Sequence, residues 1–175
     1  MTKRPFSLAG FATLFALSLP APTLAEVDCS NKPHIRDRFS VSGPFVKQLD
    51  QPLEWKRCSE GTRWDSKKRR CYGEPLLISQ DQAVLRFEDN KNGWRLPTIQ
   101  ELFSLLYSTC ANKKELRTLF PDLRLPMFRE SAHFWSTTQD EDLTRMYYYL
   151  DFKSYALDFH SQGYSLAVRA VRDTN

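Results

Sequence analysis

The clearest pattern in the chain is an apolar stripe that follows Pro97. Ile99, Leu102, Phe103 and Leu106 are spaced at i, i+3, i+4 and i+7, which places them on one face of a helix. A proline holds the residue before it in an extended conformation, so the chain should enter this helix from a strand or a loop. The pattern therefore predicts a helix that buries this stripe against a core.

The start of this helix carries a capping box. Thr98 and Glu101 have the S/T-x-x-E spacing, in which the hydroxyl accepts from a first-turn amide and the carboxylate accepts from the cap amide. Residues 89–93, which end at Gly93, are expected to form the turn before the cap. We expect the helix to run to about Ser108.

Two shorter helices are expected on either side. Residues 79–87 have Ser79 as a candidate N-cap and acidic Asp81 in the first turn, where it complements the helix dipole. Residues 112–120 predict a further short helix, which Pro121 stops.

The remaining apolar pattern is typical of strands, because it is rich in aromatic and β-branched residues. Strands are expected at 52–58, 134–138, 146–152, 155–159 and 165–172. In the last two of these, apolar and polar residues alternate with period two, and a turn at 161–163 separates them. This pattern predicts neighbouring antiparallel strands. In the second strand, Arg169 and Leu166 should lie on opposite faces. Helices followed by a meander predict an α+β fold.

The N-terminus predicts export. Lys3 and Arg4 precede an apolar run that is too short to span a bilayer comfortably, and Ala25 offers a small-residue cleavage point. We expect a signal peptide over 1–25, an irregular arm with one short strand over 26–50, and a single domain over 51–175. An uncleaved anchor or a lipoprotein is a less favoured alternative.

No later apolar run reaches membrane-spanning length, so the mature protein should lie in the periplasm or outside the cell, without membrane insertion after cleavage. Removing Lys3 and Arg4 from the 25 basic residues leaves 23 against 21 acidic ones, a formal charge near +2. Net charge therefore does not indicate a partner.

Four cysteines in an exported chain predict two disulfides. We favour Cys58 with Cys71, and Cys29 with Cys110, among three possible pairings. A zinc site is the alternative, but the chain has no C-x-x-C motif and only three histidines. The metal and cofactor prediction is therefore none.

Several motifs together resemble a known family. They are Leu-Glu-Trp-Lys-Arg-Cys at 53–58, Gly-Trp-Arg-Leu-Pro-Thr-Ile-Gln-Glu-Leu at 93–102, Phe-Trp-Ser-Thr-Thr at 134–138 and Val-Arg-Ala-Val-Arg at 168–172. In this order they resemble the C-terminal domain family of the Legionella collagen-like protein, also called domain of unknown function 1566. The resemblance covers roughly residues 50–172.

The resemblance implies a C-type-lectin-like fold, with two main helices packed on a twisted antiparallel sheet. Family members are exported bacterial proteins, and the member that names the family resembles an adhesin for sulfated glycosaminoglycans. This chain lacks a Gly-x-y collagen stalk, so trimeric display is not implied. The resemblance supports the fold more strongly than the function.

Clustered cations with interleaved tryptophans provide the best candidate binding surface. The candidate ligand-binding residues are Lys56, Arg57, Arg63, Trp64, Lys67, Lys68, Arg69 and Arg70, together with Tyr147 and Tyr149 from the tyrosine-rich strand. The alternative for the basic cluster is a solvated face that nearby carboxylates neutralise, with the tryptophans in the core. The alternative for the tyrosines is core packing and coverage of the sheet. Arg95, Arg169 and Arg172 lie in the fold-defining motifs, so we expect them in internal ion pairs with carboxylates such as Glu101, Asp151 or Asp158.

The sequence lacks the calcium-binding and catalytic motifs for which we searched. Neither calcium-binding lectin tripeptide, Glu-Pro-Asn or Gln-Pro-Asp, occurs, and there is no G-x-S-x-G or H-E-x-x-H. His133, beside Phe134, is expected to be a packed residue rather than a general base. The sequence therefore favours a binding protein over an enzyme.

The predicted function is an exported bacterial binding module for an anionic glycan or envelope polymer. The alternative is a periplasmic protein-binding factor, such as a toxin inhibitor or immunity protein, or an accessory subunit of a secretion or pilus system. Nucleic acid would satisfy the same electrostatics, but export argues against it as the partner.

Overall fold

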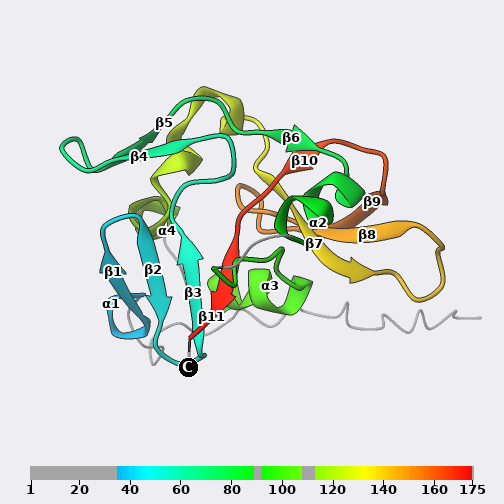
Figure 1. Cartoon of the computed structure of the whole chain (residues 1–175), viewed down its shortest axis with the longest axis horizontal. Coiled ribbons are helices and arrows are strands. Elements are labelled where there is room, and N and C mark those ends of the chain that lie inside the picture. Colours follow the sequence, from blue (N-terminus) through cyan, green and yellow to red (C-terminus); the bar gives the residue numbers. More distant parts are fainter. Residues whose placement is uncertain (1–34, 89–91, 108–112, 175) are drawn as a thin grey trace, which may run out of the picture.

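The computed structural model describes residues 35–88, 92–107 and 113–174 (Figure 1). In chain order the elements are α1 (Ile35–Arg38), β1 (Phe39–Ser42), β2 (Phe45–Gln48), β3 (Leu53–Lys56), β4 (Arg63–Asp65), β5 (Arg70–Tyr72), β6 (Leu77–Ile78), α2 (Gln80–Glu88), α3 (Ile99–Tyr107), α4 (Lys113–Leu119), the 3-10 helices η1 (Pro121–Arg124) and η2 (Pro126–Phe128), β7 (His133–Gln139), β8 (Met146–Asp151), β9 (Leu157–Ser161), β10 (Leu166–Ala167) and β11 (Val171–Asp173). The fold is mixed α+β with more strands than helices.

The predicted signal peptide and the predicted pair Cys29–Cys110 lie outside the described residues. Within the ranges that are described, no helix combines the length and the apolarity needed to cross a membrane.

The first sheet has the strand order β1-β2-β3-β11, with antiparallel neighbours throughout. Two of these strands fall in the segment expected to be an irregular arm with one strand, so that expectation was wrong for residues 39–48. Val46 on β2 lies opposite Trp55 on β3, and both side chains are completely buried. The sequence of β2 is a weak strand signal by itself, but the segment pairs with β3 and helps to bury Trp55.

The second sheet has the order β6-β10-β7-β8-β9. The antiparallel meander β7-β8-β9 is as predicted. The expected pairing of 155–159 with 165–172 was wrong, because β10 lies on the far side of β7, parallel to it, and pairs with β6. All residues from 166 to 171 are buried. Between β6 and β7, β10 has a paired neighbour on each side, whereas beside β9 it would have been an edge strand.

The C-terminal segment joins the two sheets instead of forming one long strand. After β10 the chain leaves the second sheet, and at β11 it enters the first (Figure 1). Between them, the carbonyl of Val168 accepts from the amide of Glu60 at 2.9 Å, and that of Ala170 accepts from Lys56 at 3.0 Å. These carbonyl groups of the crossing are thus paired with the end of β3 and with the chain that follows it.

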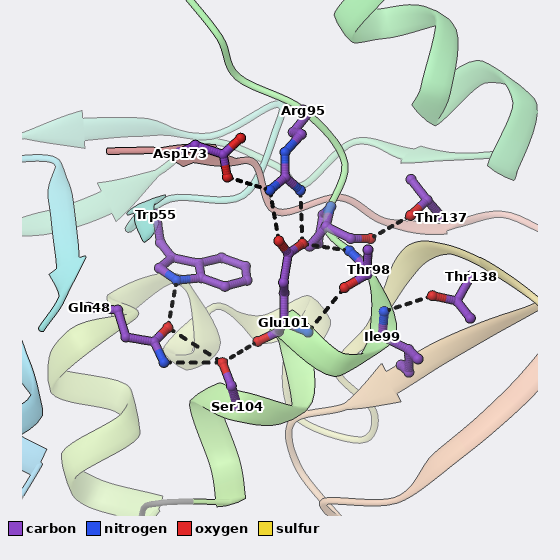
Figure 2. A network of polar contacts seen from close by, with 11 residues as sticks. Gln48, Trp55, Arg95, Thr98, Ile99, Glu101, Ser104, Thr137, Thr138 and Asp173 are labelled. Atoms are coloured by element: carbon purple, nitrogen blue, oxygen red, sulfur yellow. Dashed lines mark hydrogen bonds and ion pairs between the residues drawn. The ribbon is translucent and has the colours of Figure 1, made fainter. Parts of the chain in front are cut away.

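The cap of α3 has the geometry that the sequence predicts (Figure 2). The Thr98 amide donates to Glu101 Oε2 at 2.8 Å, and the Glu101 amide donates to Thr98 Oγ1 at 3.2 Å. The same carboxylate pairs with Arg95 at 2.7 Å, and Arg95 also reaches Asp173 on β11 at 2.8 Å. The predicted internal pair of Arg95 with Glu101 is confirmed, and it ties the helix start to the first sheet.

A second branch of this network lies on the next turn of α3. Ser104 Oγ lies 3.2 Å from Gln48 Nε2, and Trp55 Nε1 donates to Gln48 Oε1 at 3.2 Å (Figure 2). Gln48 is 2% exposed, so these bonds satisfy a buried amide. The motif at 93–102, the most recognisable in the chain, therefore has a structural role, since it caps α3 and ties it to the first sheet.

Helices cover both faces of the second sheet. Leu102 and Leu105 of α3 pack in a large core with Phe134, whereas Ala83 of α2 packs in a smaller core with Trp135. Because neighbouring residues of a strand point to opposite faces, α3 and α2 lie on opposite sides of β7. The predicted stripe of α3 needs one change, since Phe103 is 37% exposed and Leu105 takes its place in the core.

A buried ion pair connects the C-terminal segment to η1. Arg169 Nη2 lies 2.8 Å from a carboxylate oxygen of Asp122, and both side chains are inaccessible to solvent. Arg169 Nη1 donates to the carbonyls of Lys56 and Arg57 at 3.1 Å. The arginine is internally paired, as expected, but its partner is Asp122 rather than the carboxylates expected from the sequence, because the chain crossing brings it against η1.

Arg172 is also internally paired. Its Nε donates to Glu54 Oε2 on the neighbouring strand β3 at 2.7 Å. The register places the two residues directly opposite each other, which is why Glu54, rather than a more distant carboxylate, is the partner.

Candidate functional site: a basic cleft

The β4–β5 hairpin projects from one end of the molecule (Figure 1). The predicted disulfide between Cys58 and Cys71 is confirmed, with a Cα–Cα distance of 5.6 Å, and it fixes the base of the hairpin to the end of β3. At the tip, the Asp65 carboxylate accepts from two backbone amides at 2.9 Å, and Arg69 adopts a left-handed conformation with φ of 50°. The predicted basic loop is therefore an ordered hairpin.

A basic cleft lies between this hairpin and the segment formed by α4 and η1. Its volume is about 490 Å³. The lining residues are Arg57, Lys68, Arg69, Arg70, Cys71, Arg117, Thr118, Pro121, Arg124 and Leu125. Six of the ten carry a positive charge, and none is a carboxylate.

Five of these cations extend into solvent. Lys68, Arg69, Arg70, Arg117 and Arg124 are all exposed, and no ion pair within the described ranges involves any of them. Cations on the two walls of one hollow add their fields, and the low-dielectric protein between them focuses the field into the hollow. The arrangement can hold an anion that presents oxygen atoms to both walls.

Arg57 forms the floor of the basic cleft and is only 5% exposed. It donates to the carbonyls of Leu119 and Thr118 at 2.8 Å and of Gly43 at 2.9 Å. Its guanidinium also stacks on Trp64, 4.3 Å from the ring centroid. Arg57 therefore does not lie on the open surface where we expected it, because its guanidinium N–H groups donate to backbone carbonyls at the end of α4.

This buried guanidinium adds to the positive field of the cleft. Burial lowers the pKa of Arg57 below the ordinary arginine value, and the charge of Arg69 lowers it further. The two like charges repel each other, and the negative charge of Asp122 offsets part of this effect. An anion bound between them would relieve that repulsion.

The other predicted residues lie outside the basic cleft. Lys56 pairs with Glu60 at 2.8 Å, and with Arg63 and Trp64 it lines a separate hollow that shares no residue with the basic cleft. Lys67 lines a third hollow at the hairpin tip. The structure thus divides the predicted basic surface among three hollows around one hairpin.

Tyr147 and Tyr149 do not join this surface. Both lie on β8 of the second sheet, partly packed against the smaller core. We predicted both tyrosines as ligand-binding residues together with the basic residues, but they lie in a different region of the fold.

Sequence reasoning missed Arg117 and Arg124. Arg117 is a single cation in the last turn of α4, and Arg124 ends η1. Neither belongs to a local charge cluster that distinguishes it from a solvated surface residue. Only the contact between β5 and η1 brings them opposite the hairpin.

The described ranges contain no group of three or more His, Cys, Asp or Glu side chains arranged to hold a metal ion. Cys58 and Cys71 are joined to each other and so cannot bind zinc as thiolates. His133 lies 3.9 Å from Asp151 and 4.7 Å, between ring centroids, from Tyr149, which is a packed position in the sheet.

Comparison with known proteins identifies the family of the chain. A family model described as the Lcl C-terminal domain matches residues 45–172, a range that begins at β2 and ends within β11. No curated protein matches the chain. The match includes the second sheet, the capped helix, the basic cleft and all of the first sheet except β1 and the end of β11. The chain therefore belongs to the Lcl C-terminal domain family, which suggests a bacterial binding or adhesin-like module.

Proposed function

We propose that the protein is an exported, non-enzymatic binding module that holds an anionic glycan or envelope polymer in the basic cleft. The observation that carries this proposal is the set of six cations around one hollow without a lining carboxylate. The predicted signal peptide, residues 1–25, supports delivery to the periplasm or the cell exterior, where sulfated and phosphorylated polymers occur rather than nucleic acid.

The two walls of the basic cleft suit a polymer better than a small ion. Arg69 and Arg70 come from the hairpin, whereas Arg117 and Arg124 come from the α4–η1 segment. Guanidinium groups bind sulfate, phosphate and carboxylate oxygens through paired hydrogen bonds. A chain with several anionic groups would therefore bridge the walls and bind through many weak contacts.

The C-type-lectin-like architecture stays a prediction from the family resemblance. Ligand binding should depend on the loops and the hairpin, since the side chains of Arg95, Thr98 and Glu101 are engaged in the cap and the ion pair of α3.

A charge-matched pair of double variants tests the basic cleft. Arg117→Gln with Arg124→Gln removes two charges from one wall, and Lys47→Gln with Arg129→Gln removes two exposed charges elsewhere. The probe is a heparin column eluted with a salt gradient. We expect the cleft variant to bind heparin about tenfold more weakly and to elute at lower salt, because two anion contacts are lost.

The charge-matched control should elute close to the wild type. If both variants shift equally, binding depends on net charge and the cleft is not the site. If neither shifts, or the wild type is not retained, the glycan proposal fails and a periplasmic protein-binding factor becomes the better account. Circular dichroism spectra of both variants would show that the fold is intact.

A further inference from the structure

A second surface, on the β8–β9 end of the second sheet, carries a row of aromatic rings that the basic cleft does not use. We call it the aromatic face and define it by His133, Tyr147, Tyr149, His160 and Tyr164. The rings come from three strands and the turn after β9. None of these residues lines the basic cleft.

The strand register brings these rings to one side of the sheet. Tyr147 lies directly opposite His160, and Tyr149 directly opposite Asp158, so all four point to the same face. Tyr164 continues the row, because its ring stacks on His160 with centroids 3.7 Å apart and an angle of 19° between the planes. Nearly half of the Tyr164 side chain, 49%, is exposed to solvent.

The turn that carries Tyr164 is held in place from several directions. The Gln162 carbonyl accepts from the Gln80 amide at 2.9 Å, and its side chain donates to Asp81 at 2.9 Å. The Gln162 amide donates to the carbonyl of Arg145 at 2.9 Å. The exposed ring therefore stands on a fixed backbone, which reduces the entropy lost when a ligand stacks on it.

The charges beside the rings select against an anionic ligand. Tyr149 Oη lies 3.5 Å from the carboxylate of exposed Asp158. Burial raises the pKa of the Tyr149 hydroxyl, and the negative charges of Asp158 and then Asp151 raise it further. The local field is thus opposite in sign to that of the basic cleft, while the carboxylate can accept hydrogen bonds from hydroxyl groups.

From this arrangement we propose that the aromatic face binds a neutral oligosaccharide. The apolar faces of pyranose rings stack on Tyr164 and its neighbours, and sugar hydroxyls donate to Asp158. Aromatic rings with a polar edge suit such ligands, because one side of a sugar is apolar and its rim is polar. The protein would then contact a neutral glycan at one end and an anionic one at the other.

The test uses the purified full-length protein and two neutral probes, cellohexaose and chitohexaose, in isothermal titration calorimetry. Tyr164→Ala removes the most exposed ring, and Tyr164→Phe keeps it. Tyr72→Ala is the matched control, since Tyr72 is a tyrosine of similar exposure, 48%, on the β4–β5 hairpin.

We expect at least one hexasaccharide to bind, Tyr164→Ala to weaken that binding about five- to tenfold, and Tyr164→Phe to retain it. Tyr72→Ala should bind the neutral probe like the wild type. The proposal is overturned if neither probe binds at about 10 mM, or if Tyr164→Ala and Tyr72→Ala lose equal affinity.

The absence of sugar binding would assign the aromatic face to a protein interface instead. Heparin retention is a separate readout at the other end of the molecule. Failure of the neutral-sugar proposal therefore leaves the proposed anion-binding function untouched, and the reverse also holds.

Discussion

Glu101 shows how much a single side chain contributes to this fold. Its carboxylate caps α3 through the Thr98 amide and pairs with Arg95, which also contacts the last strand. Burial by itself would raise the pKa of Glu101, but the hydrogen bonds from Arg95 and Thr98 outweigh it, so the pKa lies below its ordinary value of 4.5. The folded state therefore favours the charged carboxylate.

A pH-dependent stability follows from this lowered pKa. A group whose folded pKa is depressed contributes stability that is fully present above its unfolded pKa and is lost as the pH falls through the folded value. Glu101→Gln should reduce the free energy of unfolding at pH 7 by about 1–2 kcal/mol, and the difference from the wild type should shrink below pH 4.5. Urea unfolding at pH 7 and at lower pH measures both.

Gln100→Ala, on the exposed side of the same turn, is the control, and its effect should not change with pH. A constant difference between wild type and Glu101→Gln across this range would show that the ionised form of the carboxylate is not what stabilises the cap.

At the scale of an element, the β4–β5 hairpin is a short two-stranded ribbon, which has little stability by itself. It is held by the Cys58–Cys71 disulfide at its base and by the stacking of Trp64 on Arg57. These two contacts position Lys68, Arg69 and Arg70 against the α4–η1 wall. A change that disorders the hairpin should therefore also remove one wall of the basic cleft.

Replacing both cysteines tests this dependence. Cys58→Ser with Cys71→Ser should lower the free energy of unfolding by about 3 kcal/mol, because the bridge closes a short loop of 13 residues. The same variant should elute from heparin at lower salt, since the hairpin wall is no longer fixed. Unchanged elution from a folded variant would mean that Trp64 and Arg57 hold the hairpin without the bridge.

At the scale of the whole molecule, the Asp122–Arg169 pair lies where three separate parts of the chain meet. Asp122 accepts from the Ser59 amide at 2.8 Å, while Arg169 donates to carbonyls at the end of β3. The rings of Phe120 and Phe134 enclose the guanidinium, with centroids 4.3 and 4.7 Å from its central carbon. One ion pair thus connects η1, the end of β3 and the C-terminal crossing.

Breaking this pair should cost far more than a surface ion pair. Asp122→Asn leaves a buried arginine without a countercharge and should lower the free energy of unfolding by about 3–5 kcal/mol. Asp122→Leu with Arg169→Met removes both charges and should cost less than the single change. Chemical unfolding of the two variants gives the comparison, and a double variant that is less stable than Asp122→Asn would contradict this account.

The sequence by itself determined the features that depend on near neighbours. The capping box of α3 uses Thr98 and Glu101, three residues apart, and the Cys58–Cys71 bridge spans 13 residues. The β7-β8-β9 meander likewise joins consecutive strands. Local hydrogen bonding, short loop closure and side-chain periodicity act over these distances, so their signals remain visible in the order of the residues.

Only the tertiary structure decided the features that join distant segments. It placed Arg117 and Arg124 opposite the hairpin, split the segment 166–173 between two sheets, and gave Arg169 the partner Asp122. The physical reason is that burial on all sides and charge pairing are satisfied by whichever segment packs alongside. Arg117 in its helix and Arg169 in the C-terminal crossing cannot be told apart as exposed or buried until the packing partner is known.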